Sequence, residues 1–446
     1  MSSGLVWFRK DLRLTDNPAW AAATSNHDRV AALFVIDPRL WGGAMPHRRA
    51  QLTANLHALD RQLVEAGGRL RVLTGDPLAI IPAVAAGHEA VYWNDDVSPF
   101  ARRRDGAVRG RVPAVTFHGC LVHPPGSILT NLGEPYRVFT PFWRNWSATE
   151  WEPWPETGRA AVVDDPGEGP PELSMDPYLP PGEEGARHRL SRFNVEAYES
   201  ARDRPDLLGT SFLSVDLKFG TISPRAVIRR LEGRPAEAFI RQLAWRDFYA
   251  HLLAAFPSMA STNLRPEYDG LEWRNDPDEF AAWQSGRTGY PLVDAGMRQL
   301  LETGWMHNRV RMITASFLVK DLLIDWRWGE RHFHKWLLDA DPAQNAGNWQ
   351  WVAGTGADAA PYFRVFNPVT QSRKFDPNGD YIRRFVPELA SLPTDIIHAP
   401  WEAGSSELSK CGVILGETYP SPLVDHAVSR RETIAAYEAA RNRNTG

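Results

Sequence analysis

The residues best suited to chemistry lie between positions 304 and 351. On a helix, Asn308 and Met312 stack on one face because they are four residues apart, as do His307 and Arg311. One turn then offers an amide, guanidinium groups and a soft thioether. Farther along, thirteen residues contain Asp339, Asp341, Asn345, Trp349 and Trp351. Taken alone, this second group is more typical of a capped turn that leads into a core helix.

The composition excludes several classes of protein. Two domains are expected, because 446 residues exceed what one hydrophobic core usually serves. A net charge of −4 gives no global basic field, so a DNA-binding surface has to be a local patch. Cys120 and Cys411 form neither a disulfide scaffold nor a CxxC metal site, and they suit a reducing cytoplasm. We expect no metal site, no signal peptide and no membrane span.

The elements that position these residues differ between the two parts of the chain. Short apolar runs at 5–8, 31–36, 70–73, 90–93 and 114–117 read as buried strands, and helical spacing over 48–66 separates two of them. Strand and helix in alternation predict a doubly wound, parallel, Rossmann-like α/β domain.

A second, larger domain is predicted to be all-α. Residues 151–186 contain eight prolines and have no periodicity, which indicates a long surface connection. Helical patterns follow at 224–231, 238–255, 292–302, 308–324 and 428–441. The predicted boundaries are an α/β domain over 1–130, a linker over 131–190 and a helical domain over 191–446.

Several segments are similar to the photolyase/cryptochrome family in one colinear order. They are WFRKDLRLTDNPAW, GTSFLSVDLKFGTISPR, WRDFYAHLL, TGYPLVDAGMRQL, TGWMHNRVRMITASFLVKDLLIDWRWGERHF and LLDADPAQNAGNWQWVAGTGADAAPYFRVFNP. The resemblance covers nearly the whole chain and is greatest to class I photolyases that repair cyclobutane pyrimidine dimers.

The resemblance implies that the helical domain binds FAD. The positions implied to hold its phosphates and ribose are Tyr198, Thr210, Ser211, Leu213 and Ser214. Small hydroxyl residues at a helix start suit phosphates, although the same pattern also caps helices. The positions implied around the flavin ring are Arg246, Asn308, Arg311, Asp339, Asp341 and Asn345. Asn345 matches the residue that faces the reactive ring nitrogen.

Three tryptophans match the family's electron-transfer chain from flavin to surface, namely Trp349, Trp326 and Trp273. Indoles suit this role because they are readily oxidised. Most of the chain's 18 tryptophans are expected to be ordinary core residues.

The resemblance also implies a DNA site. A lesion pocket is implied at Gln242, Trp245, Asn308, Met312 and Trp351, where indoles stack on a flipped pyrimidine dimer and amides read its edge. A phosphate-contacting rim is implied at Arg309, Arg364, Arg373 and Lys374.

Gln242 departs from the family pattern. Enzymes that repair cyclobutane dimers usually carry Glu there, and Gln resembles the (6-4) photolyases. Those enzymes, however, carry histidines at the positions of Asn308 and Met312. Cyclobutane-dimer repair is therefore the main expectation, with (6-4) repair as an alternative.

The α/β domain is implied to hold a light-gathering antenna. The positions Asp37, Met45, Arg48, Asp96 and Lys218 resemble the 8-hydroxy-5-deazaflavin site, and cations suit its anionic ring hydroxyl. A folate such as methenyltetrahydrofolate, another flavin and an empty site are the alternatives, because aspartates at strand ends are routine in turns.

The implied mechanism is light-driven. Excited, reduced anionic FAD passes an electron to the flipped dimer in single- or double-stranded DNA, the cyclobutane bonds split, and the electron returns. A cryptochrome-like photoreceptor is the main rival, but Asn345 and the short C-terminal end favour repair. We expect a cytoplasmic monomer.

Overall fold

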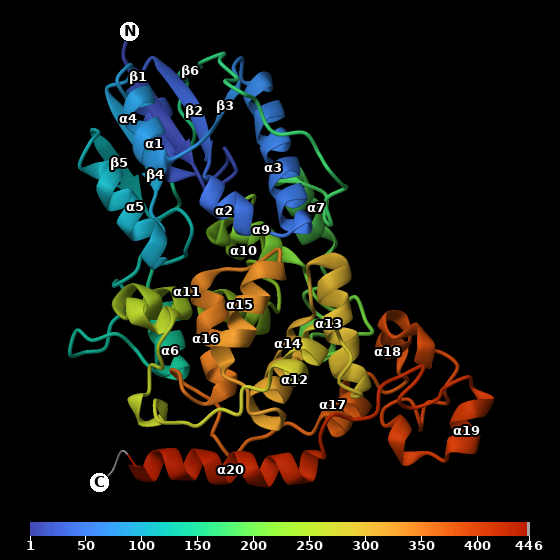
Figure 1. Cartoon of the computed structure of the whole chain (residues 1–446). Coiled ribbons are helices and arrows are strands. Elements are labelled where there is room, and N and C mark those ends of the chain that lie inside the picture. The colour runs from blue at the N-terminus through green and yellow to red at the C-terminus, as the bar shows by residue number, and fades with distance from the viewer. Residues whose placement is uncertain (444–446) are drawn as a thin grey trace. The chain divides into compact units, whose positions relative to one another are not determined.

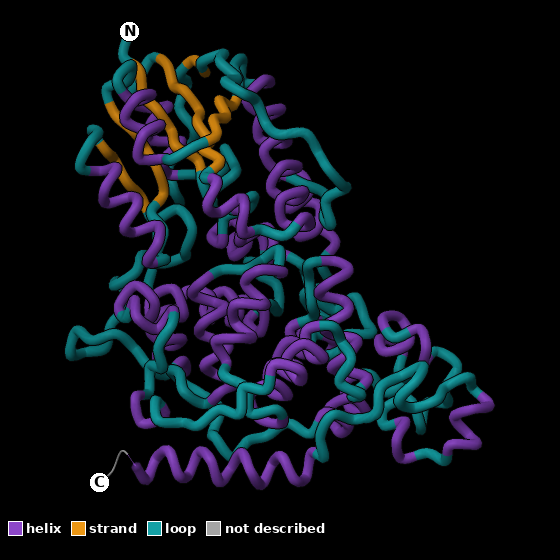
Figure 2. Tube along the Cα trace, viewed as in Figure 1, coloured by secondary structure: helices purple, strands orange, loops and turns teal. Residues whose placement is uncertain are grey.

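The computed structural model describes residues 1–443 and divides into two compact units. Unit 1 comprises Met1–Glu196, Ser211–Pro257 and Leu338–Ala343. Unit 2 comprises Ala197–Thr210, Ser258–Leu337 and Gln344–Gly446. All six named strands lie in unit 1, and unit 2 is built from helices and loops (Figure 2).

Unit 1 is organised around a parallel sheet of order β3-β2-β1-β4-β5 (Figure 1). The strands are β1 (Ser3–Phe8), β2 (Arg29–Ile36), β3 (Leu70–Thr74), β4 (Ala90–Asn94) and β5 (Ala114–Phe117). Each predicted apolar run lies in one of them, and the predicted fold class is confirmed. The runs are continuous because helices cover both faces of a parallel sheet.

Adjacent side chains of β1 reach different helices. Trp7 of β1 packs in one cluster with Ile81 of α4 and Val108 of α5. The adjacent Phe8 points to the other face and lies 5.8 Å from Trp20 of α1, measured between ring centroids. The helices of unit 1 are α1 (Pro18–Asn26), α2 (Pro38–Gly43), α3 (Pro46–Glu65), α4 (Pro77–Ala85), α5 (Pro99–Arg109), α6 (Phe139–Ala148), α7 (Gly182–Arg192), α9 (Leu213–Phe219), α10 (Pro224–Arg230) and α11 (Glu237–Ala255).

The segment predicted as a long connection takes part in the sheet of unit 1. Within it, β6 (Ala161–Val162) pairs in parallel with Arg29 and Val30 of β2. The backbone N–H of Val72 also donates to Pro166. Prolines deprive the segment of periodicity but do not prevent a short edge pairing.

The boundaries of the units also differ from the predicted domains. Helix α11 groups with unit 1 because the buried Asp247 carboxylate accepts hydrogen bonds from Val122 N, His123 N and Trp146 Nε1. These bonds join segments more than a hundred residues apart, so no local pattern reveals them.

Unit 2 contains the remaining helices. They are α8 (Tyr198–Ala201), α12 (Pro277–Gln284), α13 (Pro291–Thr303), α14 (Asn308–Ser316), α15 (Trp326–Trp336), α16 (Pro342–Ala353, beginning in unit 1), α17 (Pro368–Phe375), α18 (Asp380–Phe385), α19 (Ser405–Lys410) and α20 (His426–Arg443). Short 3₁₀ turns lie at η1 (Pro257–Ala260), η2 (Pro266–Tyr268), η4 (Pro387–Leu389) and η5 (Pro400–Glu402). Within residues 1–443, no helix has the length and apolar character needed to cross a membrane.

The helix predicted over 308–324 is interrupted. Regular α-helix ends at Ser316 and a wider π turn, η3 (Phe317–Asp321), follows. Two buried polar side chains lie in this turn: Lys320 donates to the carbonyl of Ala353, and Asp321 is hydrogen-bonded to His426. A π turn changes the direction in which the side chains of the helix point, and the apolar periodicity of the sequence does not predict it.

Candidate functional site

Charged side chains meet at the carboxyl edge of the sheet, where β1 and β4 are neighbours. Lys10 follows β1, and its Nζ lies 2.7 Å from Asp341 Oδ2 and 3.3 Å from Asp96 Oδ2. Ligands of open parallel sheets bind at this edge, where the strand order reverses. We call Lys10, Asp96, Lys218 and Asp341 the charged edge cluster. It joins a predicted antenna residue, Asp96, to a predicted flavin residue, Asp341.

The charges of this cluster stabilise one another. Burial opposes the charge on Lys10, but Asp341 and Asp96 outweigh burial and raise the pKa of its ammonium group. Burial likewise favours protonation of Asp341, yet Lys10 and Lys218 hold the pKa of this carboxyl well below its usual range. Sequence reasoning missed Lys10; the only signal was its position directly after the first strand.

The two predicted antenna cations are electrostatically linked to predicted flavin residues within unit 1. Burial, reinforced by Lys10, lowers the pKa of Lys218 to about 7. Burial lowers the pKa of Arg48 to about 10, with Asp339 partly offsetting the shift. The Lys218 ammonium can therefore gain or lose a proton near neutral pH.

Asp37 and Met45 have local roles, and Asp96 makes a local contact in addition to its ion pair with Lys10. Asp37 caps α2 by accepting a hydrogen bond from the backbone N–H of Arg39. Its carboxylate also forms an ion pair with the guanidinium group of Arg39 at 2.6 Å. Met45 is the residue before α3. Asp96 accepts from the backbone N–H of Ser98 at 3.0 Å.

Helices α9 and α11, with the residues just before α9, carry several of the flavin and lesion candidates of unit 1. Arg246 donates to the carbonyls of Cys120 (2.6 Å) and Leu217 (3.2 Å), which ties its guanidinium to the domain interior. At the start of α9, Ser211 Oγ accepts from the N–H of Leu213 at 3.2 Å. Leu213 is buried and Ser214 is exposed.

Trp245 has a stacked neighbour. Its ring lies 3.8 Å from that of Phe139, with an interplanar angle of 10°. Gln242, three residues earlier on α11, donates to the carbonyl of Ala238. The two residues occupy one helix face, and Phe139 holds the indole in a fixed orientation.

In unit 2, the predicted pairing on α14 is present. Asn308 Nδ2 lies 3.9 Å from the sulfur of Met312. Arg311 donates to the carbonyl of Met306 at 2.8 Å. His307 caps the helix, and burial lowers its pKa to about 4, so it is neutral at neutral pH.

Asn345 on α16 has a fixed amide orientation. Its Nδ2 donates to the backbone oxygen of Glu330 (2.9 Å) and to its Oε1 (2.7 Å). Both partners accept, so the amide nitrogen faces Glu330 and the amide oxygen faces away. Burial raises the pKa of Glu330 to about 6, opposed by the bond from Asn345. Sequence reasoning missed Glu330.

The predicted electron-transfer tryptophans differ in exposure. Trp349 and Trp326 are buried, and Trp273 is half-buried. Ring contacts join Trp349 to Phe333 (5.0 Å) and Trp283 (6.2 Å), a set that we call the ring cluster. Trp326 donates its indole N–H to Asn263, and Trp273 lies 6.4 Å from the ring of Tyr437.

The predicted DNA rim is partly paired. Arg309 forms an ion pair with Asp203 (2.8 Å) and lies 4.5 Å above Phe375, and Lys374 lies 5.2 Å from the same ring. The structure thus brings Arg309 and Lys374 together.

Other predicted residues of unit 2 have separate neighbours. Arg373 pairs with Glu402 at 3.2 Å, and the exposed Arg364 lies over Phe366. Trp351 is half-buried on α16, Tyr198 is buried on α8, and Thr210 closes the first segment of the unit. No group of three or more potential metal ligands occurs in the described part of the chain.

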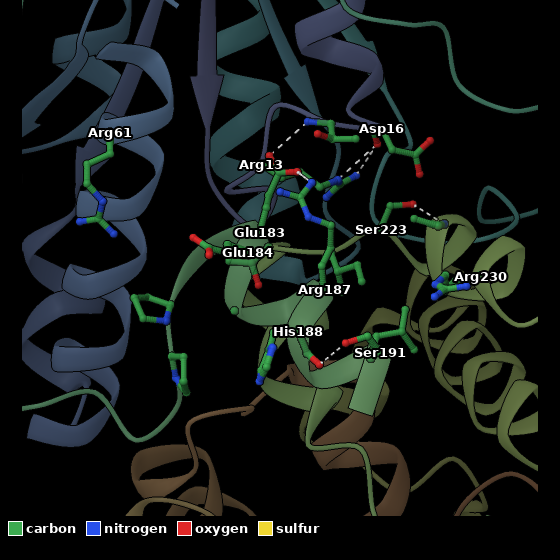
Figure 3. A pocket seen from close by; sticks show the side chains of 18 residues that line it. Arg13, Asp16, Arg61, Glu183, Glu184, Arg187, His188, Ser191, Ser223 and Arg230 are labelled. Carbon is green, nitrogen blue, oxygen red and sulfur yellow. Dashed lines mark hydrogen bonds and ion pairs between the residues drawn. The ribbon is translucent and has the colours of Figure 1, made fainter. Parts of the chain in front are cut away.

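Two cavities lie outside all these residues. One, of about 760 Å³ in unit 1, is bordered by Arg13, Asp16, Arg187 and Arg230 (Figure 3). There, the Arg13 guanidinium donates to the backbone oxygen of Asp16. The other, of about 670 Å³, lies in unit 2 against α12 and α15.

Comparison with known proteins agrees with this architecture. Residues 4–159 match the DNA photolyase family model, and residues 239–439 match the FAD binding domain of DNA photolyase. A deoxyribodipyrimidine photo-lyase from Agrobacterium fabrum is 43% identical over 473 residues, which cover 98% of each chain.

Two solved structures are similarly close. A bacterial class III photolyase from Agrobacterium tumefaciens has 41% identity and a TM-score of 0.91, covering 99% of this chain and 98% of that one. An archaeal photolyase from Sulfolobus tokodaii with two FAD molecules has 34% identity and a TM-score of 0.87, covering 98% and 100%.

The chain belongs to the DNA photolyase family. The predicted enzyme type and the FAD-binding domain are thereby confirmed. Class I membership and the deazaflavin antenna remain predictions.

Proposed function

We propose that this protein repairs cyclobutane pyrimidine dimers in DNA, using blue or near-UV light and FAD. The observation that carries the proposal is the fixed amide of Asn345, which presents a neutral acceptor oxygen while Glu330 occupies its nitrogen. A neutral acceptor at this position suits the N–H of a reduced flavin without adding charge. The proposal rests also on the family to which the chain belongs.

The proposed flavin residues fit the donor set that FAD requires. Bound reduced FAD supplies the light-driven electron that opens the cyclobutane ring. Arg246 and Arg311 supply positive charge that favours an anionic ring, and both guanidinium groups are anchored on backbone carbonyls. Asp339 and Asp341 provide acceptors for the ring edge and ribose. The phosphates and ribose would be held by Tyr198, Thr210, Ser211, Leu213 and Ser214.

The lesion residues have distinct tasks. Trp245, held by Phe139, and Trp351 each offer an indole to the bases of the flipped dimer. Gln242 and Asn308 supply amides for carbonyl edges, and Met312 supplies an adaptable apolar contact. Arg309, Arg364, Arg373 and Lys374 would contact phosphates.

A first test separates the possible substrates. Oligonucleotides with either a cyclobutane dimer or a (6-4) photoproduct are incubated with the reduced protein under blue light and in darkness. We expect light-dependent repair of the cyclobutane dimer alone. Repair of the (6-4) lesion instead would identify the protein as a (6-4) photolyase. Repair of neither lesion would favour a cryptochrome-like photoreceptor.

Gln242 provides a sharper test of substrate choice. In a Gln242→Glu variant, the carboxylate typical of cyclobutane-dimer enzymes is restored, so dimer affinity or quantum yield should change. If the variant and the parent bind and repair the dimer equally well, the amide of Gln242 in place of a carboxylate has no effect on function.

For the antenna, we propose 8-hydroxy-5-deazaflavin bound by Asp37, Met45, Arg48, Asp96 and Lys218. Arg48 and Lys218 supply the cations that suit an anionic ring hydroxyl. Since the Sulfolobus tokodaii structure is described with two FAD molecules, a second FAD is an alternative, as is a folate. The protein is purified from hosts that make the deazaflavin, FAD or the folate, and its absorption spectrum shows which of these chromophores is bound.

We also propose a cytoplasmic monomer. Cys120 and Cys411 are both unpaired thiols, as a reducing compartment favours. Light scattering of the purified protein, with and without DNA, tests the monomer.

A further inference from the structure

A groove in unit 2 lies between α12 and α15, outside every residue assigned above. It has a volume of about 670 Å³. On α15, Trp328, Arg331, His332, Lys335 and Trp336 all border it. Their spacing of three and four residues places them on one helix face. One face of the helix therefore combines aromatic rings with positive charge.

Aromatic rings from both helices line the groove. Trp328 lies 5.1 Å from Phe280 of α12, with an interplanar angle of 72°. Trp336 lies 6.1 Å from the ring of His332. Trp328 and Trp336 are only half-buried, so parts of both indoles remain available to a planar ligand.

His332 has an unused hydrogen-bonding atom. The side chain is buried, and its Nδ1 lies 2.9 Å from Gln284 Nε2. Nε2 is buried and has no hydrogen-bond partner in the described part of the chain. Burial, reinforced by Lys335, lowers the pKa of His332 to about 4, so the ring is neutral and carries one proton. With Gln284 donating to Nδ1, that proton is on Nε2 and lacks an acceptor.

The open side of the groove is cationic. Arg331 and Lys335 are both exposed one helical turn apart. The carboxylate of the neighbouring acid, Glu330, accepts a hydrogen bond from Asn345. An anion at the mouth of the groove thus meets two cations.

We propose that this groove binds a nucleoside monophosphate group. The base stacks on Trp328 or Trp336, an acceptor atom of the base takes the N–H of His332, and the phosphate pairs with Arg331 and Lys335. The group is either a free nucleotide or the phosphorylated end of a DNA strand. The site goes beyond the proposed repair reaction and uses none of its residues.

The test uses the FAD-loaded protein and calorimetric titration with 5′-AMP. We expect binding that weakens about tenfold in an Arg331→Gln/Lys335→Gln variant, because each charge-assisted contact is lost. Adenosine, which has no phosphate, should bind more weakly than AMP. An Arg430→Gln/Arg431→Gln variant removes the same charge from exposed positions of α20 and should bind AMP as the parent does.

Two further measurements identify which molecule supplies the nucleotide and where it binds. A short single strand with a 5′ phosphate, compared with the same strand without one, shows whether a strand end occupies the groove. Weakening of either ligand by the Arg331/Lys335 substitutions supports the proposal. The proposal is overturned if neither ligand binds, if these substitutions leave binding unchanged, or if Trp351→Ala in the lesion pocket abolishes AMP binding instead.

Discussion

The charged edge cluster of unit 1 and the ring cluster of unit 2 are stabilised in different ways. At the sheet edge, Lys10 is held between two carboxylates, and the pKa of each partner depends on the others. Around Trp349, the uncharged rings of Phe333 and Trp283 pack at 5.0 to 6.2 Å. Removing one charge therefore leaves the opposite charges buried without a partner. Exchanging one aromatic ring for another keeps the packing but changes how readily the ring is oxidised.

The largest expected effect comes from the ring cluster. In a Trp349→Phe variant, an oxidisable indole is replaced by a ring that is hard to oxidise, so photoreduction of bound FAD should be nearly abolished. Trp273→Phe should slow photoreduction less completely. Repair by chemically reduced enzyme should persist in both, measured as dimer repair under blue light.

The control for these variants is Trp7→Phe, a buried ring of the sheet outside the predicted chain. Photoreduction should survive this change. Loss of both photoreduction and repair in Trp273→Phe would contradict the electron-supply role.

The second effect tests the edge cluster. Lys10→Met leaves Asp96 and Asp341 without their shared cation, and should lower the unfolding free energy at pH 7 by about 3 kcal/mol. Because the folded pKa of Asp341 is depressed, the stabilisation is present above the ordinary aspartate pKa and disappears as pH falls. The loss in Lys10→Met should accordingly shrink in acid.

Urea unfolding at several pH values measures this difference. Lys410→Met, the same chemical change at an exposed position of α19, should have little effect. An equal loss in both variants, or one that does not vary with pH, would refute the role of Lys10.

A third, smaller effect concerns Glu330, a titratable partner of Asn345. Its folded pKa of about 6 lies above the ordinary value for Glu, so ionisation costs stability as pH rises from about 4.5 to 6. Glu330→Gln keeps an acceptor for Asn345 and should stabilise the protein by about 1 to 2 kcal/mol above pH 6, measured by urea unfolding. The gain should vanish in acid; a gain that is independent of pH would contradict burial of the carboxylate as its cause.

The smallest effect concerns the exposed charges of α17. Lys374→Gln should weaken DNA binding similarly for all sequences and lower the salt dependence by about one phosphate contact. Arg373→Gln should do less, because Glu402 already pairs with Arg373. DNA-binding titrations at several salt concentrations compare the two variants with the parent. If the affinity of all three proteins depends equally on salt, neither Lys374 nor Arg373 contacts a phosphate.

The parts that local pattern could predict are those with short-range causes. The five strands appear as continuous apolar runs because both sheet faces are covered, and α3 and α20 follow from helical spacing. The contact of Asn308 with Met312 follows from a spacing of four residues on α14. Family resemblance then supplied roles for residues whose types alone were ambiguous.

The parts that were missed have long-range causes. β6 lies in a proline-rich segment, and only its pairing with β2 makes it a strand. Glu330 is fifteen residues from Asn345, and nothing in its local sequence indicates the bond. The π turn at Phe317–Asp321 depends on carbonyls and side chains supplied by distant segments.

The amino-acid order alone thus established the fold class, the family and the chemical types at the proposed site. Tertiary packing established which charges are paired: Lys10 and Asp341 are 331 positions apart and meet only because α16 begins at the sheet edge. Periodicity reports burial along one element, but a charge is stabilised by whichever partner folding brings near.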